Sequence, residues 1–287
     1  PLLENGCGKA MNVCREEAFR HFEALGGVPY KTEDYWYTGL SSVLGLDYKI
    51  VLKYIAQDVD LKEVFRCAVP DLLTNLILTV NGWYFKENAP IEIPEGVIVC
   101  GLQEAGVKYP HLLESHYNRY TPAAAKDGMI ALNTAFAQDG LFVYIPKNTV
   151  VERPLQVVNL LRAKADLMAF QRNLIVVEAG AQATMLVCDH TLSDNRFLMN
   201  NTTEVYLGEG AHLDYYQVQN QHLGASQINS LLISEQRNSV FESNLVTLYG
   251  GMIRNNQYVA LNGEGGECHL YGIYILDKSQ HVDNYSY

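Results

Sequence analysis

Short apolar runs alternate with small acidic turns along the second half of the chain. The runs at 174–177 and 184–187, for example, flank a turn of sequence Glu-Ala-Gly-Ala. Three such turns lie at 178–181, 208–211 and 263–266, and a degenerate fourth lies at 234–238, so that a glutamate recurs every 26 to 31 residues. Units of this length bury their apolar face only by stacking on their neighbours. Because helix-period patterning is weak between the turns, the repeats predict a β-solenoid rather than a helical one.

The strands of this region mix apolar runs with strict alternation. In 240–247, Phe241 and Leu245 share one face with two hydroxyl residues, and the other face carries Glu242 and Asn244. Side chains two residues apart lie on the same face of a strand, and turn glycines permit backbone angles that a β-carbon disfavours. We therefore predict a mainly β fold, a stacked two-sheet parallel solenoid from about residue 139 onward. Its core is expected to include Val176, Leu186, Leu245 and Ile273.

The first part of the chain has a different pattern, which predicts a small α/β region. A helix capped by Asn12 is expected to bury an apolar face that includes Cys14 and Phe22, and to end at the glycine pair 26–27. Further helical patterns lie near 110–117 and 123–136. Short strands are predicted at 50–55, 76–80, 91–93 and 97–100, with an Asn-Gly hairpin signal at 81–82.

This change of pattern divides the chain into two regions. Residues 1–138 form a predicted N-terminal helical and mixed α/β region, and residues 139–287 form a β-helix core. The chain stops at Tyr287 inside an apparent strand, and a solenoid needs a cap to cover its open edge. An end inside a strand predicts that the sequence is a piece of a longer protein, or that the protein relies on a partner to cover this edge.

Charge and hydropathy narrow the class of partners. Lysine and arginine total 21 against 32 acidic residues, which gives a net charge of −11. Without a basic block, the chain lacks the electrostatic footprint of a protein that binds nucleic acid or an anionic membrane. The apolar run 72–80 is too short to span a bilayer, and no charged-then-apolar leader opens the chain. We expect a cytoplasmic protein that contacts neither nucleic acid nor membrane.

No motif identifies a catalytic residue, and none predicts a bound cofactor. The sequence contains neither a phosphate-binding loop of the Gly-x-x-x-x-Gly-Lys type nor a Gly-x-Ser-x-Gly elbow. The repeated glutamates fall in turns rather than on one strand face, which disfavours paired-carboxylate hydrolysis. Six cysteines lie at 7, 14, 67, 100, 188 and 268 without a Cys-x-x-Cys pair, so we expect buried, reduced thiols.

A few pairs of residues have donor atoms that suit a metal ion. The weak candidates are Cys268, His269, His281 and Asp283, with His212-Leu213-Asp214 and Cys188-Asp189-His190 as further pairs. Residues i and i+2 of a strand share a face, but a metal site needs three or four converging ligands. We therefore predict hydrogen-bonded histidines and buried thiols, with no metal site, and we interpret Arg254-Asn255-Asn256 as a solvated turn.

Several longer motifs are spread along the chain. They are Asn-Thr-Ala-Phe at 133–136, Asp-Gly-Leu-Phe-Val-Tyr-Ile-Pro-Lys-Asn at 139–148, Glu-Arg-Pro-Leu-Gln at 152–156, Arg-Asn-Leu-Ile-Val-Val-Glu-Ala-Gly-Ala at 172–181, Gly-Glu-Gly at 263–265, Leu-Tyr-Gly at 270–272 and Gln-His-Val-Asp-Asn at 280–284. Together these motifs resemble the SufB/SufD superfamily of the Suf iron–sulfur cluster assembly machinery, and within it SufD. The resemblance covers nearly the whole chain, including 25–26 and 31–38 near its start.

The resemblance implies a right-handed parallel β-helix and a non-catalytic scaffold that acts with SufB and the ATPase SufC. It implies that no cofactor is bound by this chain alone, and that an iron–sulfur cluster belongs to the assembled complex. SufB carries a cysteine near the position of Cys188, but here the thiol is one residue out of register, so that role is not transferred. The resemblance also implies that the chain ends before the family's last core strands and C-terminal helical domain, which are expected to hold the SufC-binding surface.

Two other interpretations and one assembly state follow from the same patterns. The alternatives are a β-helix carbohydrate-active enzyme, which an aspartate-lined groove would favour, and a cupin-like barrel that binds a metal or small molecule. The open terminal edge and the resemblance together predict a homodimer through 267–287 when the protein is expressed alone.

Overall fold

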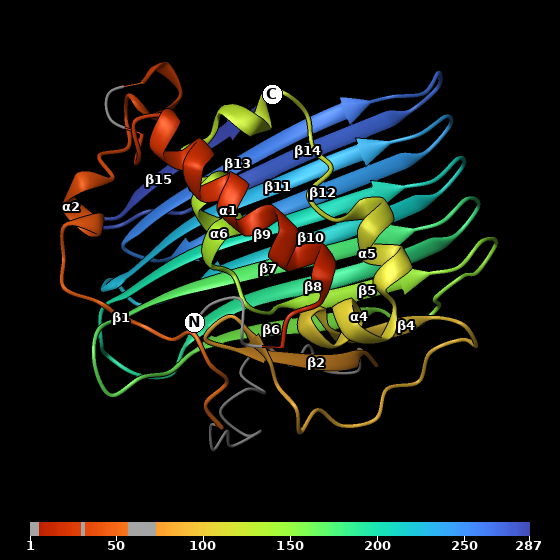
Figure 1. The fold of residues 1–287 in the computed structure, drawn as a ribbon, viewed down its shortest axis with the longest axis horizontal. Coiled ribbons are helices and arrows are strands. Elements are labelled where there is room, and N and C mark those ends of the chain that lie inside the picture. The colour runs from red at the N-terminus through yellow and green to blue at the C-terminus, as the bar shows by residue number, and fades with distance from the viewer. Residues whose placement is uncertain (1–5, 30–31, 57–72) are drawn as a thin grey trace.

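The computed structural model, which describes residues 6–29, 32–56 and 73–287, is a two-sheet parallel β-solenoid. Successive strands pass from one sheet to the other, so each sheet is built from alternate strands (Figure 1). Sheet A has the order β15 (His281–Ser286), β13 (Met252–Leu261), β11 (Ala225–Glu235), β9 (Phe197–Leu207), β7 (Leu167–Val177), β5 (Leu141–Ile145) and β4 (Ile98–Gly101), with β1 (Lys49–Ile50) beside β7.

Sheet B faces sheet A across the core. Its order is β14 (Glu267–Tyr274), β12 (Val240–Tyr249), β10 (His212–Asn220), β8 (Gln182–Thr191), β6 (Leu155–Leu161), β2 (Asn75–Val80) and β3 (Trp83–Tyr84). From β5 onward all pairings that the structure describes between neighbouring rungs are parallel and nearly unshifted. The predicted solenoid is thereby confirmed, and the closed barrel of the cupin-like alternative is wrong.

Inward side chains stack in columns along the solenoid axis. Val143, Ile175, Val205 and Ile233 occupy equivalent register positions on four successive strands of sheet A, and all are buried. Such a column places apolar side chains on like neighbours and removes them from water together. Val176 and Leu245 are buried as predicted. Leu186 and Ile273 point outward from β8 and β14, where Leu186 is half-buried and Ile273 is 56% exposed, so their prediction as core residues is wrong.

One corner of the solenoid is a stack of similar turns, the turn ladder. Its members are the left-handed residues Asn148, Gly180, Gly210, Asn238 and Gly265, with φ between 52° and 72°. Each turn bonds to the next, as in Gly180 N to Glu209 O and Gly210 N to Arg237 O, both 2.9 Å. The predicted turns at 178–181, 208–211 and 263–266 are confirmed, the one predicted at 234–238 lies at 236–239, and the sequence pattern missed the first turn, at Asn148.

The glutamates of these turns are not equivalent, because Glu235 lies one or two residues ahead of the others. It pairs in register with Leu207, the last residue of β9, whereas Glu209 lies beyond that strand in the turn. A shift of one residue turns a strand side chain to the opposite face. Glu235 therefore points into the core, where it is fully buried. The apparent repeat of four turn glutamates is wrong at this one position.

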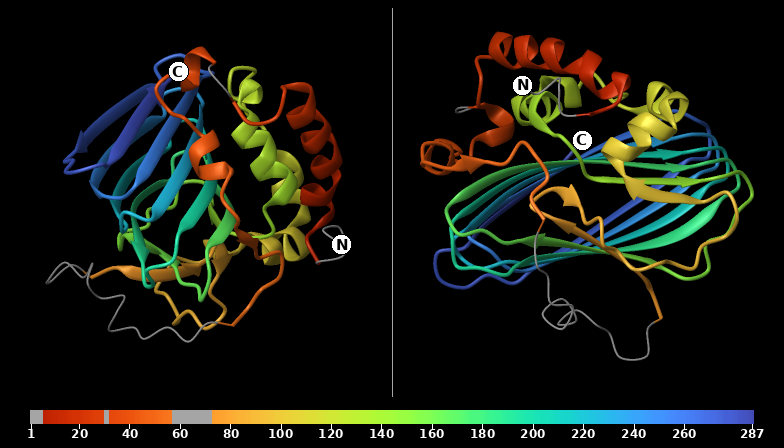
Figure 2. Two further views of the ribbon diagram at one scale, coloured as in Figure 1. Left: turned by 90° about the vertical axis from the view of Figure 1, so that its left-hand side faces the viewer. Right: turned by 60° about the horizontal axis from the view of Figure 1, so that its bottom comes forward.

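The helices that the structure describes lie on the outer face of sheet A, as both views in Figure 2 show. They are α1 (Lys9–Ala24), α2 (Ser41–Leu44), α4 (Leu102–Lys108), α5 (Pro110–His116) and α6 (Gly128–Phe136), with short turns η2 (Glu33–Tyr35) and η4 (Ala124–Lys126). α6 contacts β7 and β9, and α1 packs on α6. In the described part of the chain, no helix is long and apolar enough to cross a bilayer.

Helix α1 begins earlier than predicted. Its N-cap is Gly8, and the Asn12 side chain donates instead to Cys7 O at 2.9 Å, so the prediction that Asn12 caps the helix is wrong. The reason is tertiary, because a β-carbon on Gly8 would lie 2.2 Å from Gly106 O in α4. The predicted end is confirmed, since Gly26 and Gly27 both have positive φ.

The N-terminal region contributes strands to both sheets. β2 pairs with β6 and β4 pairs with β5, while the Asn81-Gly82 turn joins β2 to β3 as predicted. The strand predicted at 50–55 is reduced to Lys49–Ile50, and 91–93 is not a strand. Cys67 and part of the apolar run 72–80 lie outside the described residues. The division at residue 138 stays a prediction.

Candidate functional site

Polar side chains form two facing columns inside the apolar solenoid, here named the polar seam. The column of sheet B comprises Thr79, Asn159, Asp189, Gln219 and Thr247, which occupy one register position on five neighbouring strands. The column of sheet A comprises Gln171, Asn201, Asn229, Asn255 and Asn284. Because side chains alternate between the two faces of a strand, all residues of a column lie on the inner face of their sheet. The seam therefore runs through the core parallel to the solenoid axis.

Hydrogen bonds connect the seam both along and across the sheets. Along sheet B, Thr79 donates to Asn159 Oδ1 at 2.6 Å, and Asn159 donates to Asp189 at 2.8 Å. Across the core, Gln219 donates to Asn255 Oδ1 at 2.9 Å and accepts from its Nδ2 at 3.2 Å. Buried polar groups are costly unless they are paired, so this pairing favours one register of the rungs over its neighbours.

Asp189 is the ionisable group of the seam. Its carboxylate accepts hydrogen bonds from Asn159 Nδ2 at 2.8 Å, Gln217 Nε2 at 2.9 Å and Gln227 Nε2 at 3.2 Å. Burial raises the pKa of Asp189 above its ordinary value, and these three donors oppose that rise. One sequence signal for the seam is Asn159, the polar residue within the apolar run Val157-Val158-Asn159-Leu160. The pairing of polar side chains across the two sheets could not be predicted from the sequence.

Cys268 faces the core and lies near Glu235, which belongs to the opposite sheet. Burial, and then the Glu235 carboxylate, raise the pKa of the Cys268 thiol to about 12. Burial also raises the pKa of Glu235 to about 7, and a hydrogen bond from Ser239 Oγ at 3.3 Å opposes this. A thiol held in its protonated form is a weak metal ligand and a weak nucleophile.

His281 and Asp283 are brought together on the outer side of β15. Thr38 Oγ1 lies 3.4 Å from His281 Nε2 and donates to Asp283 Oδ2, so one hydroxyl contacts both side chains. Asp283 is already neutralised by Arg254, which also donates from Nε to Asn256 Oδ1 at 2.6 Å. These contacts connect the N-terminal segment to the last described strand. Because the side chains already bond to Thr38 and Arg254, they do not form a set of free metal ligands.

Arg254 and Asn256 lie buried in β13, so their interpretation as a solvated turn is wrong. The Arg254 guanidinium lies 4.6 Å from the ring centre of Tyr35. Tyr35 in turn donates to Asp127 Oδ2 at 2.9 Å, and Asn256 Nδ2 reaches the same oxygen at 3.2 Å. Burial raises the pKa of Asp127, and the hydrogen bonds that its carboxylate accepts from the Met129 N–H and from the Tyr35 and Tyr258 hydroxyls oppose that rise.

The four weak metal candidates do not form one cluster. Cys268 points inward from β14, His269 points outward from the same strand, and the other two belong to sheet A. His269 approaches Glu267 at 3.4 Å. Among the described residues, no group of three or more histidine, cysteine or carboxylate side chains is placed to hold a metal ion. The absence of metal from the isolated chain stays a prediction, to be tested by metal analysis of protein purified without oxygen.

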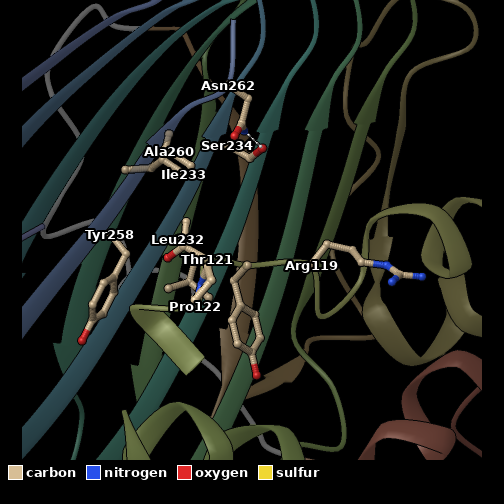
Figure 3. Close-up of a pocket in the computed structure, with 10 residues that line it drawn as sticks. Arg119, Thr121, Pro122, Leu232, Ile233, Ser234, Tyr258, Ala260 and Asn262 are labelled. Carbon is tan, nitrogen blue, oxygen red and sulfur yellow. Dashed lines mark hydrogen bonds between the residues drawn. The ribbon is translucent and has the colours of Figure 1, made fainter. Parts of the chain in front are cut away.

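A pocket of about 290 Å³ lies on the outer face of sheet A, beside the loop that follows α5 (Figure 3). Ser234 and Asn262 form one end and are joined by a hydrogen bond of 2.9 Å, whereas the Arg119 side chain extends away from them. The wall is completed by Tyr120, Thr121, Pro122, Leu232, Ile233, Tyr258 and Ala260. The volume is at the lower limit for small-molecule sites, and the described residues that line the pocket include no carboxylate, histidine or cysteine.

Two family models together match nearly the whole chain. Residues 1–157 match the model described as the SufBD protein N-terminal region. Residues 160–287 match the model described as the SUF system FeS cluster assembly, SufBD core domain.

Individual relatives carry the same description. An iron–sulfur cluster assembly SufBD family protein of Arabidopsis thaliana is 31% identical over 170 residues, which are 59% of this chain and 36% of that protein. A chloroplastic relative from the same plant is 36% identical over 133 residues, or 46% of this chain and 24% of that protein. A relative from Synechocystis is 23% identical over 270 residues, or 90% of this chain and 58% of that protein. The chain thus spans 24% to 58% of the length of these curated relatives, and it belongs to the SufBD family of iron–sulfur cluster assembly proteins.

Proposed function

We propose that this protein is a SufD-type scaffold subunit of the Suf iron–sulfur cluster assembly complex. In this proposal it acts with SufB and the ATPase SufC and catalyses no reaction itself. The observation that carries the proposal is the match of the SufBD N-terminal and core models to residues 1–157 and 160–287. Any iron–sulfur cluster is then cargo of the assembled complex rather than a resident group of this chain, and the cytoplasm is its proposed location.

The architecture supports a scaffold role. A scaffold must hold its partners in fixed relative positions, and the polar seam and the turn ladder each join successive rungs through hydrogen bonds. The last described strands also offer apolar surface, since Tyr271 and Tyr274 of β14 are 54% and 55% exposed. Exposed apolar patches of this kind are typical of sites where other proteins bind.

Co-expression with SufB and SufC tests this assignment. We expect the three proteins to co-purify at fixed stoichiometry, with ATP hydrolysis that requires SufC and is absent when this chain is alone. Recovery of a SufB–SufC complex that excludes this chain, under conditions where all three are folded, would contradict the scaffold role.

A second comparison locates the SufC contact. We infer from the resemblance to SufD that residues 1–287 do not include the SufC-binding surface, so the 287-residue chain is expected to bind SufC far more weakly than a full-length SufD protein does. A docking surface is a contiguous patch of about 800 Å² on each partner, and loss of its helices removes most of it. Equal affinity of the two lengths for SufC would place the contact within the residues described here.

A further inference from the structure

None of the described residues covers the outer face of sheet B over β10, β12 and β14, in contrast to the helix-covered outer face of sheet A (Figure 2). Along β10 and β12 inward residues are buried and outward ones are half-buried or exposed, whereas every residue of the last strand, β14, is half-buried or exposed. The outward apolar residues occupy two adjacent register rows, which we name the apolar rows. They are Leu186, Tyr216 and Tyr271 in one row, and Val218, Val246 and Ile273 in the other.

Carboxylates lie beside the apolar rows. Asp214 and Glu242 are register partners two residues before Tyr216 and Asn244; their register partner on β14 is His269, and Glu267 lies two residues earlier on that strand. β8, β10, β12 and β14 contain no lysine or arginine. Asp214 contacts His212 at 2.9 Å, Glu242 accepts from Asn244 Nδ2 at 2.9 Å, and among the described residues neither carboxylate is paired with a lysine or an arginine. The face therefore combines an apolar stripe with an adjacent stripe of carboxylates that contains no lysine or arginine, which we name the negative stripe.

We propose that this face binds an amphipathic helix of a partner protein, with an apolar stripe flanked on one side by lysine or arginine. The chemistry of the two stripes selects this occupant. Outward apolar residues on the opposite sheet of the same solenoid are buried under α1 and α6, which shows that a helix is a geometrically suitable cover for these strands. The face includes outward side chains of β14, which is also the last described strand of sheet B, but the proposal is argued from the two stripes and does not depend on the scaffold role.

Dimensions fit a short helix that lies along the solenoid axis. Four strands spaced about 4.8 Å apart span about 14 Å, which is the length of about ten helical residues. An apolar stripe at i, i+3, i+4 and i+7 would then follow the apolar rows, and cations on one flank would reach Asp214 and Glu242. The negative stripe disfavours an anionic lipid surface, and it disfavours a second copy of the same face by like-charge repulsion.

The test uses a designed helical peptide of about 18 residues as the probe. One version carries leucines on one face and lysines on one flank, and a second version replaces those lysines with glutamates. We expect the lysine peptide to bind the purified protein in fluorescence anisotropy, and the glutamate peptide to bind at least about tenfold more weakly at low salt. The difference should shrink as added salt screens the charges.

Variants on the face separate the two stripes. Ile273→Ser should weaken binding of the lysine peptide by about tenfold or more, since it removes an apolar side chain from the contact. Asp214→Asn together with Glu242→Gln should weaken it several-fold and reduce its salt dependence. Val107→Ser and Glu114→Gln, which change exposed residues of α4 and α5, are the matched controls and should leave affinity unchanged.

Hydroxyl-radical footprinting gives an independent readout of position. Bound peptide should protect Tyr216 and Tyr271 from oxidation, while Tyr37, which is 81% exposed elsewhere, should react as before. Equal binding of the two peptides, equal loss of affinity in Val107→Ser, or no protection of Tyr271 would overturn the proposal. Protection of Tyr216 without peptide, either at high protein concentration or in a longer native chain, would assign the face to a second copy or to another segment of the same protein.

Discussion

Arg172 and Glu204 form a buried ion pair on the outer face of sheet A, with 2.7 Å between Arg172 Nη2 and Glu204 Oε1. Glu204 also accepts the backbone N–H groups of Asn118 and Arg119, at 3.1 and 3.0 Å. Arg172 in turn donates to Thr134 Oγ1 of α6 at 3.0 Å. One pair of charges thus attaches both the loop after α5 and helix α6 to the solenoid.

Loss of one partner of this pair should be strongly destabilising. Glu204→Leu leaves a buried guanidinium without its counter-charge and removes the acceptor of two N–H groups. We expect it to lower the free energy of unfolding by about 3–5 kcal/mol in chemical denaturation. Arg196→Met breaks the exposed pair with Asp166 and serves as the control, with an expected loss of about 1 kcal/mol or less. Similar losses for the two variants would contradict the assignment.

Stability should decrease as the pH rises through neutrality because of Glu235. Burial raises the pKa of its carboxyl from 4.5 to about 7, so the folded state holds the proton more tightly than the unfolded chain does. The corresponding stabilisation is complete below pH 4.5 and is lost as pH rises through 7, by at most about 3 kcal/mol. Asp139, whose pKa burial raises to about 6, adds a change of the same sign at lower pH.

Glu235→Gln isolates this contribution. The amide keeps the shape of the side chain and cannot ionise, so the variant should lose the part of the decline that lies near pH 7 and keep the part due to Asp139. Unfolding free energies measured between pH 5 and 8.5 provide the comparison. Parallel curves for the variant and the parent protein would show that Glu235 does not titrate in this range.

Glycines of the turn ladder should differ in their tolerance of alanine. A β-carbon at Gly180 would lie 2.4 Å from Asn148 Oδ1, whereas nothing lies within 4 Å of one at Gly210. Both positions have positive φ, so each substitution carries the same backbone strain of about 1–2 kcal/mol. We expect Gly180→Ala to lower the melting temperature more than Gly210→Ala does. The double variant Asn148→Gly with Gly180→Ala should recover the difference, and equal effects of the single variants would refute the steric argument.

Expressed alone, the protein should self-associate through the end of the solenoid near 267–287. β14 and β15 are the last described strands of their sheets, and unpaired strand edges favour pairing with another chain. Tyr274→Glu, at an exposed position of β14, should shift sedimentation from dimer to monomer, while Val107→Glu on α4 should not. A monomer at high concentration without any substitution would contradict this expectation.

The periodic parts of the fold were predictable from sequence, whereas contacts between distant segments were not. Recurring turns and the alternation around Phe241 identify stacked parallel strands, because both depend on local chemistry. The N-terminus of α1 was misplaced because Gly8 is fixed by its close approach to Gly106. Glu235 was assigned to a turn because an offset of one residue is invisible in an approximate repeat. The pairing of Gln219 with Asn255 depends on how the two sheets face each other. The order of polar and apolar residues along each strand does not specify that arrangement.

The two corners of the solenoid have unequal freedom to change in length. At the turn ladder, the links 178–181, 208–211 and 236–239 each hold four residues between strands and 262–266 holds five, whereas the first link, 146–154, holds nine. At the opposite corner the links vary from two residues at 250–251 to six at 275–280. Evolution can therefore lengthen the second corner without disturbing the first, which must keep its hydrogen-bonded spacing. Engineered insertions, such as an epitope or a fluorescent label, belong at 275–280, where they leave the turn ladder intact.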